Sequence, residues 1–383
     1  MKKIFKTIFF IGMVHAYGQV LFISNNSSVT VASSSVLSSV DSLINYGIIT
    51  NDGNLVMSSG WLNFGTYNPG SGRITFNGLG EQIINHNAQS FSRLVIDGGG
   101  IKRYLADIVI ENELQLINGF LVAENNSRII INPAASVINA SDASHISGSV
   151  SILNRTGPFI IPIGNGVRLL PVRVNGNSLN ATFEVVDFGS PQSFAFSGQE
   201  LSAIVQNRYW RVQADNGSLG PGQIGLRLSG DENLPAVSDS RLAVIQSPSS
   251  NIFFRPLGSV NHSASHIEEG FVMNMNEFTE DIITLGILSE DIVVYNAISS
   301  NDDGRNDVLL IWNIEAYPNN RVSIFNRWGD LVFETRGYNN DTNAFRGYAN
   351  VSGNSRLPAG TYFYIIDRGD GSPRVTGYLS LKN

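Results

Sequence analysis

Short alternations of apolar and polar residues, separated by Asn-Gly, Asp-Gly and Ser-Gly pairs, run through most of this chain and restrict what it can fold into. Successive side chains of a β-strand point to opposite faces, so this alternation is typical of strands with one buried face. No long segment shows the three-to-four-residue apolar period of an amphipathic helix. The chain of 383 residues, long enough for about two or three domains, is therefore predicted to be all-β.

Residues 19–147 are predicted to form a β-solenoid, in which each coil buries its inward residues against the next coil. The strands are short and are separated by Asn/Gly turns at near-even spacing, as in Asn45-Tyr46-Gly47-Ile48 and Asn63-Phe64-Gly65. The repeat is degenerate, so an ordinary two-sheet sandwich is the alternative. The residues predicted to point inward are Ile48, Leu55, Ile74, Phe76, Leu94, Ile96, Ile108, Ile110, Leu114, Leu116, Ile129 and Ile131.

Residues 148–290 change pattern and are predicted to form a β-sandwich. About ten strand candidates follow one another about a dozen residues apart, which is the spacing of a sandwich. Trp210 is expected to anchor the core of this domain. No linker rich in Pro or Ser separates it from the last domain, so we expect the two to abut.

Residues 291–383 contain two predicted hairpins. In the first, Val322 and Ile324 alternate with polar residues before a turn at Asn326-Arg327-Trp328-Gly329, and Leu331 and Phe333 follow it. The second runs over Thr361–Asp367, turns at Arg368-Gly369-Asp370-Gly371 and returns. Both alternating sets of its first arm are apolar, which predicts a strand covered on both faces. These sets are Tyr362, Tyr364 and Ile366, and Phe363 and Ile365.

This last segment resembles the gliding-motility-associated C-terminal domain, the type B sorting domain of the type IX secretion system in Bacteroidetes. Where the family usually has Gly the chain has Asp302, and where it often has Trp, near Thr342, Phe345 is expected to fill the gap. The residues that carry the resemblance are Asn301, Asp303, Gly304, Asn306, Asp307, Phe325, Asn326, Arg327, Trp328, Gly329, Pro358, Gly360, Tyr362, Gly369, Asp370 and Gly371.

The resemblance implies a small Ig-like β-sandwich that the type IX secretion translocon reads. It also implies a porin-like outer-membrane β-barrel partner, with which such domains stay attached at the cell surface. Pairing of an open sheet edge with the barrel or translocon is a plausible mode of docking, because open edges accept an added strand.

The front of the chain has the pattern of a signal peptide over residues 1–18. Lys2, Lys3 and Lys6 form the basic region, Ile8–Val14 the apolar run, and small residues lead to predicted cleavage before Gln19. A buried N-terminal strand is the alternative. No other apolar run is long enough to span a bilayer, so the mature chain is expected to lack a transmembrane segment.

Charge and cysteine content exclude several classes of function. The formal net charge of −7 argues against nucleic acid, whose phosphates need a basic patch. The chain has no cysteine, which excludes disulfides, thiolate metal sites and a Cys nucleophile. The chain also lacks a nucleophile elbow, so no catalytic or cofactor-binding residue is predicted and an enzyme is not expected.

Two segments have residues of the kinds that bind metal ions. The loop Asn301–Asp307 carries oxygen-bearing side chains around a Gly, as calcium requires, with Asp303, Asn306 and Asp307 as candidate ligands. A self-capping Asx turn is the alternative. No cofactor other than calcium is expected. His262 and His266 have a spacing suited to zinc on a helix, but their surroundings indicate a loop.

The function predicted from these features is a secreted, cell-surface-attached protein with a structural or adhesive passenger, serving gliding motility or surface adhesion. One alternative is a carbohydrate-binding module that uses Trp61, Tyr67 and Trp210 as stacking platforms. Another is a secreted polysaccharide-active hydrolase. The tripeptide Arg368-Gly369-Asp370 spells an adhesion motif, but the family places a Gly-Asp-Gly turn there in any case.

Overall fold

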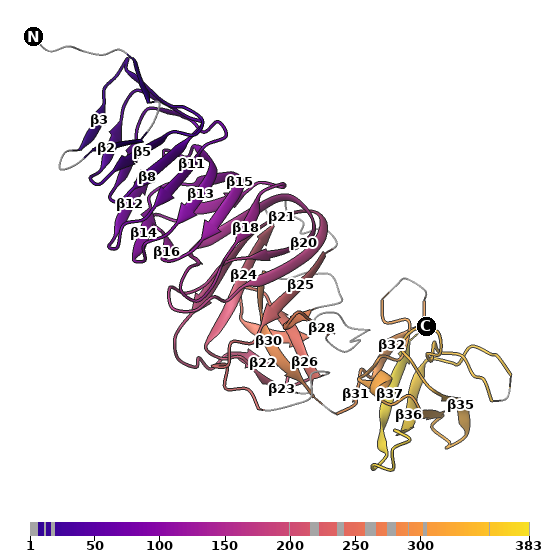
Figure 1. Cartoon of the computed structure of the whole chain (residues 1–383). Helices are drawn as coiled ribbons and strands as arrows, with labels where there is room; N and C mark the ends of the chain where they lie inside the picture. The colour runs from indigo at the N-terminus through magenta and orange to yellow at the C-terminus, as the bar shows by residue number, and fades with distance from the viewer. Residues whose placement is uncertain are drawn as a thin grey trace, which may run out of the picture.

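The computed structural model describes residues 7–10, 13–16, 20–198, 200–214, 222–235, 241–256, 266–273, 281–289, 291–301, 305–351 and 353–382. The described part of the chain contains no α-helix, and its strands confirm the all-β prediction. None of its elements is a helix long and apolar enough to cross a membrane. A coiled N-terminal region, a central region and a small C-terminal domain follow one another along the molecule (Figure 1).

The N-terminal region is a parallel β-solenoid of about seven turns, so the sandwich alternative is wrong for residues 19–147. One face is a four-stranded sheet of β1 (Thr7–Phe10), β4 (Ser28–Val31), β7 (Ile48–Asn51) and β10 (Thr66–Asn68). A second face holds β3 (Leu21–Ile23), β6 (Leu43–Asn45), β9 (Trp61–Asn63), β12 (Gln82–Asn85), β14 (Ile101–Tyr104), β16 (Phe120–Ala123) and β19 (Ile146–Ser147). The third face holds β2 (Met13–Ala16), β5 (Val36–Ser39), β8 (Asn54–Met57), β11 (Arg73–Phe76), β13 (Ser90–Ile96), β15 (Ile108–Leu116), β17 (Arg128–Ile131) and β18 (Ser136–Ile138).

Apolar side chains at equal register stack through the solenoid. A continuous ladder on the third face joins Leu37, Leu55, Ile74, Leu94 and Leu114. All the residues predicted to point inward are buried except Ile48, which is 45% exposed. Ile49 occupies the inward place instead: it is buried and lies in register with Val29 and Tyr67, which are also buried. A slip of one residue moves a strand's side chains to the other face.

The strands β1 and β2 lie inside the segment predicted to be a signal peptide. They pair in parallel with β4 and β5 and add a first coil to the solenoid. This pairing corresponds to the alternative of an N-terminal strand, and cleavage before Gln19 stays a prediction.

The central region continues directly from the solenoid. Strand β20 (Ser149–Ile161) pairs in parallel with β17 and antiparallel with β21 (Val172–Asp187), whose two halves pair with β25 and β24. Trp210 is fully buried and donates its indole N–H to the Leu170 carbonyl (3.0 Å), which confirms it as a core anchor. The remaining strands are β22 (Ala195–Phe196), β23 (Leu201–Ile204), β24 (Arg208–Ala214), β25 (Gly222–Arg227), β26 (Leu242–Ser247), β27 (Phe253–Pro256), β28 (His266–Glu268), β29 (Phe271–Met273) and β30 (Ile282–Leu288).

One hydrophobic core fills both regions. It begins at Ile23 in the solenoid and extends without a break to Ile287 in β30. The solenoid and the central region therefore share packing across the position where the sequence pattern changes.

The C-terminal domain is built on a five-stranded sheet in the order β32-β37-β36-β34-β35. Its strands are β32 (Ala297–Ser299), β34 (Arg321–Phe325), β35 (Leu331–Arg336), β36 (Gly360–Asp367) and β37 (Val375–Lys382), which confirms both hairpins. One face packs on a core that also includes the pair β31 (Val293–Val294) and β33 (Ile311–Trp312) and the 3₁₀ turn η2 (Ile314–Ala316). Phe345 is fully buried in this core, where the family often has Trp.

The central region and the C-terminal domain abut, as expected. Trp312 of β33 is buried in a cluster formed mainly by the central region, including Leu201 and Phe254. Across the same contact the Tyr295 hydroxyl donates to the Glu200 carboxylate, and Asn313 donates to the Ser289 carbonyl at 3.3 Å.

Candidate functional site

The outer face of the C-terminal sheet is uncovered and carries a row of aromatic rings. Phe363 of β36 lies directly opposite Phe325 of β34 on one side and Tyr378 of β37 on the other. Phe363 is 48% exposed and Tyr378 is 58% exposed. The prediction that β36 is covered on both faces is therefore wrong: Tyr362, Tyr364 and Ile366 are buried in the core, and their neighbours face solvent.

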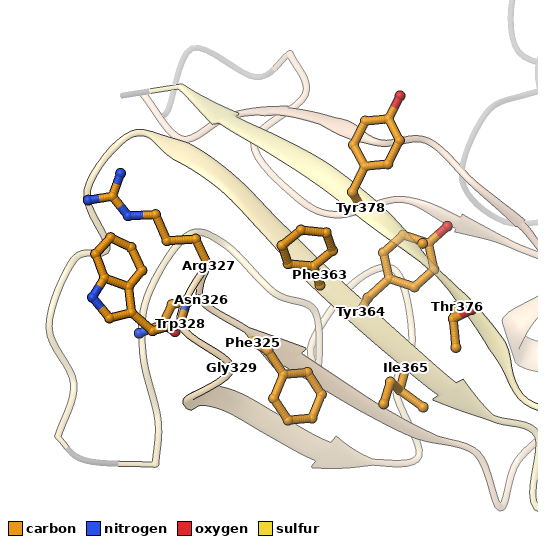
Figure 2. A pocket seen from close by; sticks show the side chains of 11 residues that line it. Phe325, Asn326, Arg327, Trp328, Gly329, Phe363, Tyr364, Ile365, Thr376 and Tyr378 are labelled. Atoms are coloured by element: carbon orange, nitrogen blue, oxygen red, sulfur yellow. The ribbon is translucent and has the colours of Figure 1, made fainter.

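The turn between β34 and β35 adds a cation and an indole to one end of this row (Figure 2). The Asn326 side-chain carbonyl accepts from the Trp328 and Asp330 N–H groups at 2.9 and 3.0 Å, and Gly329 has a φ of 89°. The sequence-predicted turn is thus confirmed, and Gly329 suits its left-handed conformation. The Arg327 guanidinium lies 3.6 Å from the centre of the Trp328 ring, and Trp328 is 64% exposed.

We define the aromatic face as Phe325, Arg327, Trp328, Phe363, Ile365 and Tyr378, which line a shallow hollow of about 700 Å³. The strands β34, β36 and β37 position its members by strict alternation, since every second residue on each strand turns to this side. Only the turn residues Arg327 and Trp328 lie outside this alternation.

Two arginines elsewhere on this sheet face are held in ion pairs. Arg321 contacts the Glu334 carboxylate at 2.7 Å, and this bond holds the pKa of Glu334 below its usual range. Arg374 contacts Asp367 at 3.3 Å. Arg327 forms no ion pair with any residue that the structure describes. The aromatic face is therefore apolar along its length and positive at one end.

The outer edge of the sheet is occupied at β35. Asn350 donates its backbone N–H to the Val332 carbonyl (3.0 Å), and its side chain both accepts from the Glu334 N–H and donates to the Glu334 carbonyl, each at 2.9 Å. At the opposite edge the Ser299 N–H of β32 is bonded to the Asn306 carbonyl at 2.8 Å. These bonds use backbone groups that an added strand would need.

The predicted calcium loop is described only in part. Asp303 and Gly304 lie outside the described residues; Asn301 is exposed, and Asn306 has a φ of 55°. Asp307 is half-buried. Within the described ranges no three His, Asp or Glu side chains gather to hold a metal ion. Calcium binding by Asp303, Asn306 and Asp307 stays a prediction.

The second turn is folded against its own domain. Arg368 donates to the Ser372 hydroxyl at 3.2 Å and lies 5.5 Å from the Tyr317 ring, while the Asp370 carboxylate accepts from the Ser372 N–H at 2.9 Å. A Cβ on Gly369 would lie 2.3 Å from the Asn319 carbonyl oxygen. The tripeptide is thus part of a packed turn, with its Arg directed back onto the domain.

The structure does not support two further sites that sequence motifs suggest, the zinc site and the carbohydrate-stacking platforms. His266 begins strand β28, so the helical spacing for zinc is absent there, and His262 lies outside the described residues. The carbohydrate platforms proposed at Trp61, Tyr67 and Trp210 are wrong, because all three rings are buried.

The remaining residues of the family motif have structural roles. Pro358 accepts a bond from the Tyr362 hydroxyl at its carbonyl (2.8 Å), and Gly360 opens β36. Gly371 takes a φ of 86° in the turn between β36 and β37. The sequence motif includes Phe325, Arg327 and Trp328 but not Phe363 and Tyr378. Phe363 and Ile365 on the outward side of β36 and Tyr378 of the neighbouring β37 are apolar or aromatic, and this pattern could have indicated an exposed aromatic face.

Comparison with known proteins assigns the C-terminal domain. Residues 292–381 match the CHU_C Type IX secretion signal domain. Neither a protein of curated function nor a solved structure matches the chain. The segment that carries both hairpins and the aromatic face is therefore a type IX secretion signal domain, which supports export of the chain.

Proposed function

We propose that this protein is exported by the type IX secretion system, remains attached to the cell surface and displays a structural or adhesive passenger. The observation that carries the proposal is the signal domain at residues 292–381. Its expected partners are the type IX translocon and a porin-like outer-membrane β-barrel that retains it at the surface.

The passenger has the construction of a rigid spacer. Its solenoid and central region share one hydrophobic core, and each coil is held by the backbone bonds of parallel strands to the next. Trp312 joins this passenger to the signal domain through a buried contact. A rod with one end fixed to the envelope supports a role in gliding motility or in adhesion to a surface.

The carbohydrate-binding and hydrolase alternatives stay predictions. Three exposed rings of the solenoid, Phe22, Tyr46 and Phe64, lie side by side: Phe22 is tilted by 47° against Tyr46, and Tyr46 is stacked on Phe64 with 5.2 Å between the ring centres. No cluster in the described part of the chain adds support to hydrolysis.

Deletion of residues 291–383 tests the export proposal. In a type IX-competent host, the full chain should reach the cell surface, while the shortened chain should accumulate in the periplasm. Fractionation and protease accessibility of whole cells measure both. Resistance of the periplasmic product to limited proteolysis checks that the passenger has folded. Finding the shortened chain on or outside the cell would contradict the proposal.

A further inference from the structure

We propose that the aromatic face is the surface through which the signal domain docks on a protein of the outer-membrane export machinery, and that the partner's contact surface is apolar and places a carboxylate against Arg327. This inference rests on the proposed function, because it identifies the part of the signal domain that the machinery recognises.

The first argument is the exposure of the rings. Phe363, Tyr378 and Trp328 are each about half exposed or more, although side chains of these kinds are usually covered in a folded domain. Contiguous apolar patches on a soluble domain typically mark interaction sites, and Tyr, Trp, Phe and Arg are enriched in protein interfaces. Their alignment on neighbouring strands gives a partner a rigid, preformed surface.

The second argument is charge. Arg321 and Arg374 on the same sheet face are held in ion pairs, whereas Arg327 lies beside the aromatic row and has no ion pair among the described residues, so it is the charge that a partner meets at this end of the aromatic face. Its contact with Trp328 holds the guanidinium in place beside the aromatic row. An Arg held in this way loses little conformational freedom when a partner carboxylate forms a bidentate pair with it.

The third argument concerns the sheet edges. Asn350 occupies the edge groups at Val332 and Glu334, so strand addition at β35 requires these bonds to break first. Docking on the aromatic face requires no such rearrangement. The face therefore replaces the open edge as the expected contact with the export machinery.

The chemistry of the face favours a protein over a polysaccharide. The Asn326 side chain is engaged in its own turn, and Glu334 and Asp367 are held in ion pairs. Few polar groups are thus left free to bind the many hydroxyls of a sugar chain, whereas the apolar row suits the core of a protein interface.

The test uses the full chain in a type IX-competent host. One variant combines Phe363→Ser with Tyr378→Ser, and a second carries Arg327→Glu. Matched controls are Tyr348→Ser, whose ring is 41% exposed away from this face, and Arg346→Glu. We expect the double variant to lower the exported fraction about tenfold, equivalent to about 1.4 kcal/mol of docking free energy, and Arg327→Glu to lower it several-fold. The controls should export as the wild type does.

Melting temperatures of the purified chains show whether each variant folds. A photo-crosslinking residue at position 363 of the full chain should capture an outer-membrane protein, and the same residue at position 348 should not.

Folded face variants that are exported at the wild-type level would overturn this inference, while the proposed function would stand as long as deletion of residues 291–383 still blocks export. Export of the deleted chain would overturn the proposed function itself. Loss of polysaccharide pull-down by the face variants, with export unchanged, would also overturn the inference and assign the face to glycan.

Discussion

At the scale of single residues, the buried polar groups of this protein depend on exact partners, and His86 shows how. Its Nδ1 accepts from the Trp61 indole N–H at 3.0 Å, so the proton resides on Nε2, which lies 3.1 Å from the Ser90 carbonyl oxygen. The ring also stacks on Phe91 at 3.7 Å. Burial lowers the pKa of His86 to about 3, because an imidazolium would lose hydration there.

This pKa predicts acid sensitivity of the solenoid. The unfolded chain binds a proton at His86 below its ordinary pKa of 6.5, while the folded chain does not until about pH 3. Stability is therefore lost as pH falls from 6.5 towards 3, by up to about 1.4 kcal/mol per pH unit. In His86→Gln, which can still accept from Trp61, this contribution should vanish. Urea unfolding of both chains between pH 7 and 4 measures it; a wild-type-to-variant difference that does not change with pH would contradict the prediction.

Arg208 provides a second residue-scale prediction. It is fully buried and contacts Asp187 at 3.4 Å, Asp231 at 2.5 Å and Glu232 at 3.1 Å. Arg208→Met should destabilise the central region by about 3–5 kcal/mol, because it leaves buried carboxylates unpaired. Arg211→Met, which removes a partly exposed pair with Glu184, should cost about 1 kcal/mol or less. Chemical denaturation compares the two, and equal losses would contradict the assignment.

At the scale of elements, the hairpins and the solenoid could be predicted from the strand pattern, because the alternation of apolar residues and the Asn/Gly turns are visible in short stretches of sequence. The strand pattern did not give the register at Ile48, because Ile48 and Ile49 are both apolar and only the pairing of Ile49 with Val29 and Tyr67 decides which of them points inward. It also did not show that Phe363 is uncovered, because an apolar residue on a strand looks the same in sequence whether a second layer or a partner covers it. Trp61 and Tyr67 look like exposed platforms for the same reason.

Asn350 carries the element-scale prediction. Asn350→Ala removes its two side-chain bonds to the Glu334 backbone and frees part of the β35 edge. We expect a loss of about 1–2 kcal/mol in the signal domain and concentration-dependent self-association, since free edges pair with one another. Light scattering and thermal unfolding measure both effects. Asn350→Asp keeps an acceptor for the Glu334 N–H, so it should fall between the wild type and Asn350→Ala; an Ala variant that stays monomeric would contradict the expected role.

At the scale of the whole molecule, Trp312 couples the export signal to its passenger. The burial of this ring among central-region residues predicts that Trp312→Ser loosens the junction at residues 289–292 without unfolding either side. Limited proteolysis should then cut at the junction several-fold faster, a change equivalent to about 1 kcal/mol. Scattering profiles should show a more variable overall dimension. An unchanged cleavage rate would mean that the contact does not fix the two parts.

The solenoid and the signal domain lie at opposite ends of the molecule (Figure 1). Because neighbouring coils are separated by the distance between paired strands, about 4.8 Å, insertion or loss of one whole coil would shift the reach of the molecular tip by that amount. Reach into the surroundings is thus adjustable in fixed increments, while the signal domain at the other end stays unchanged.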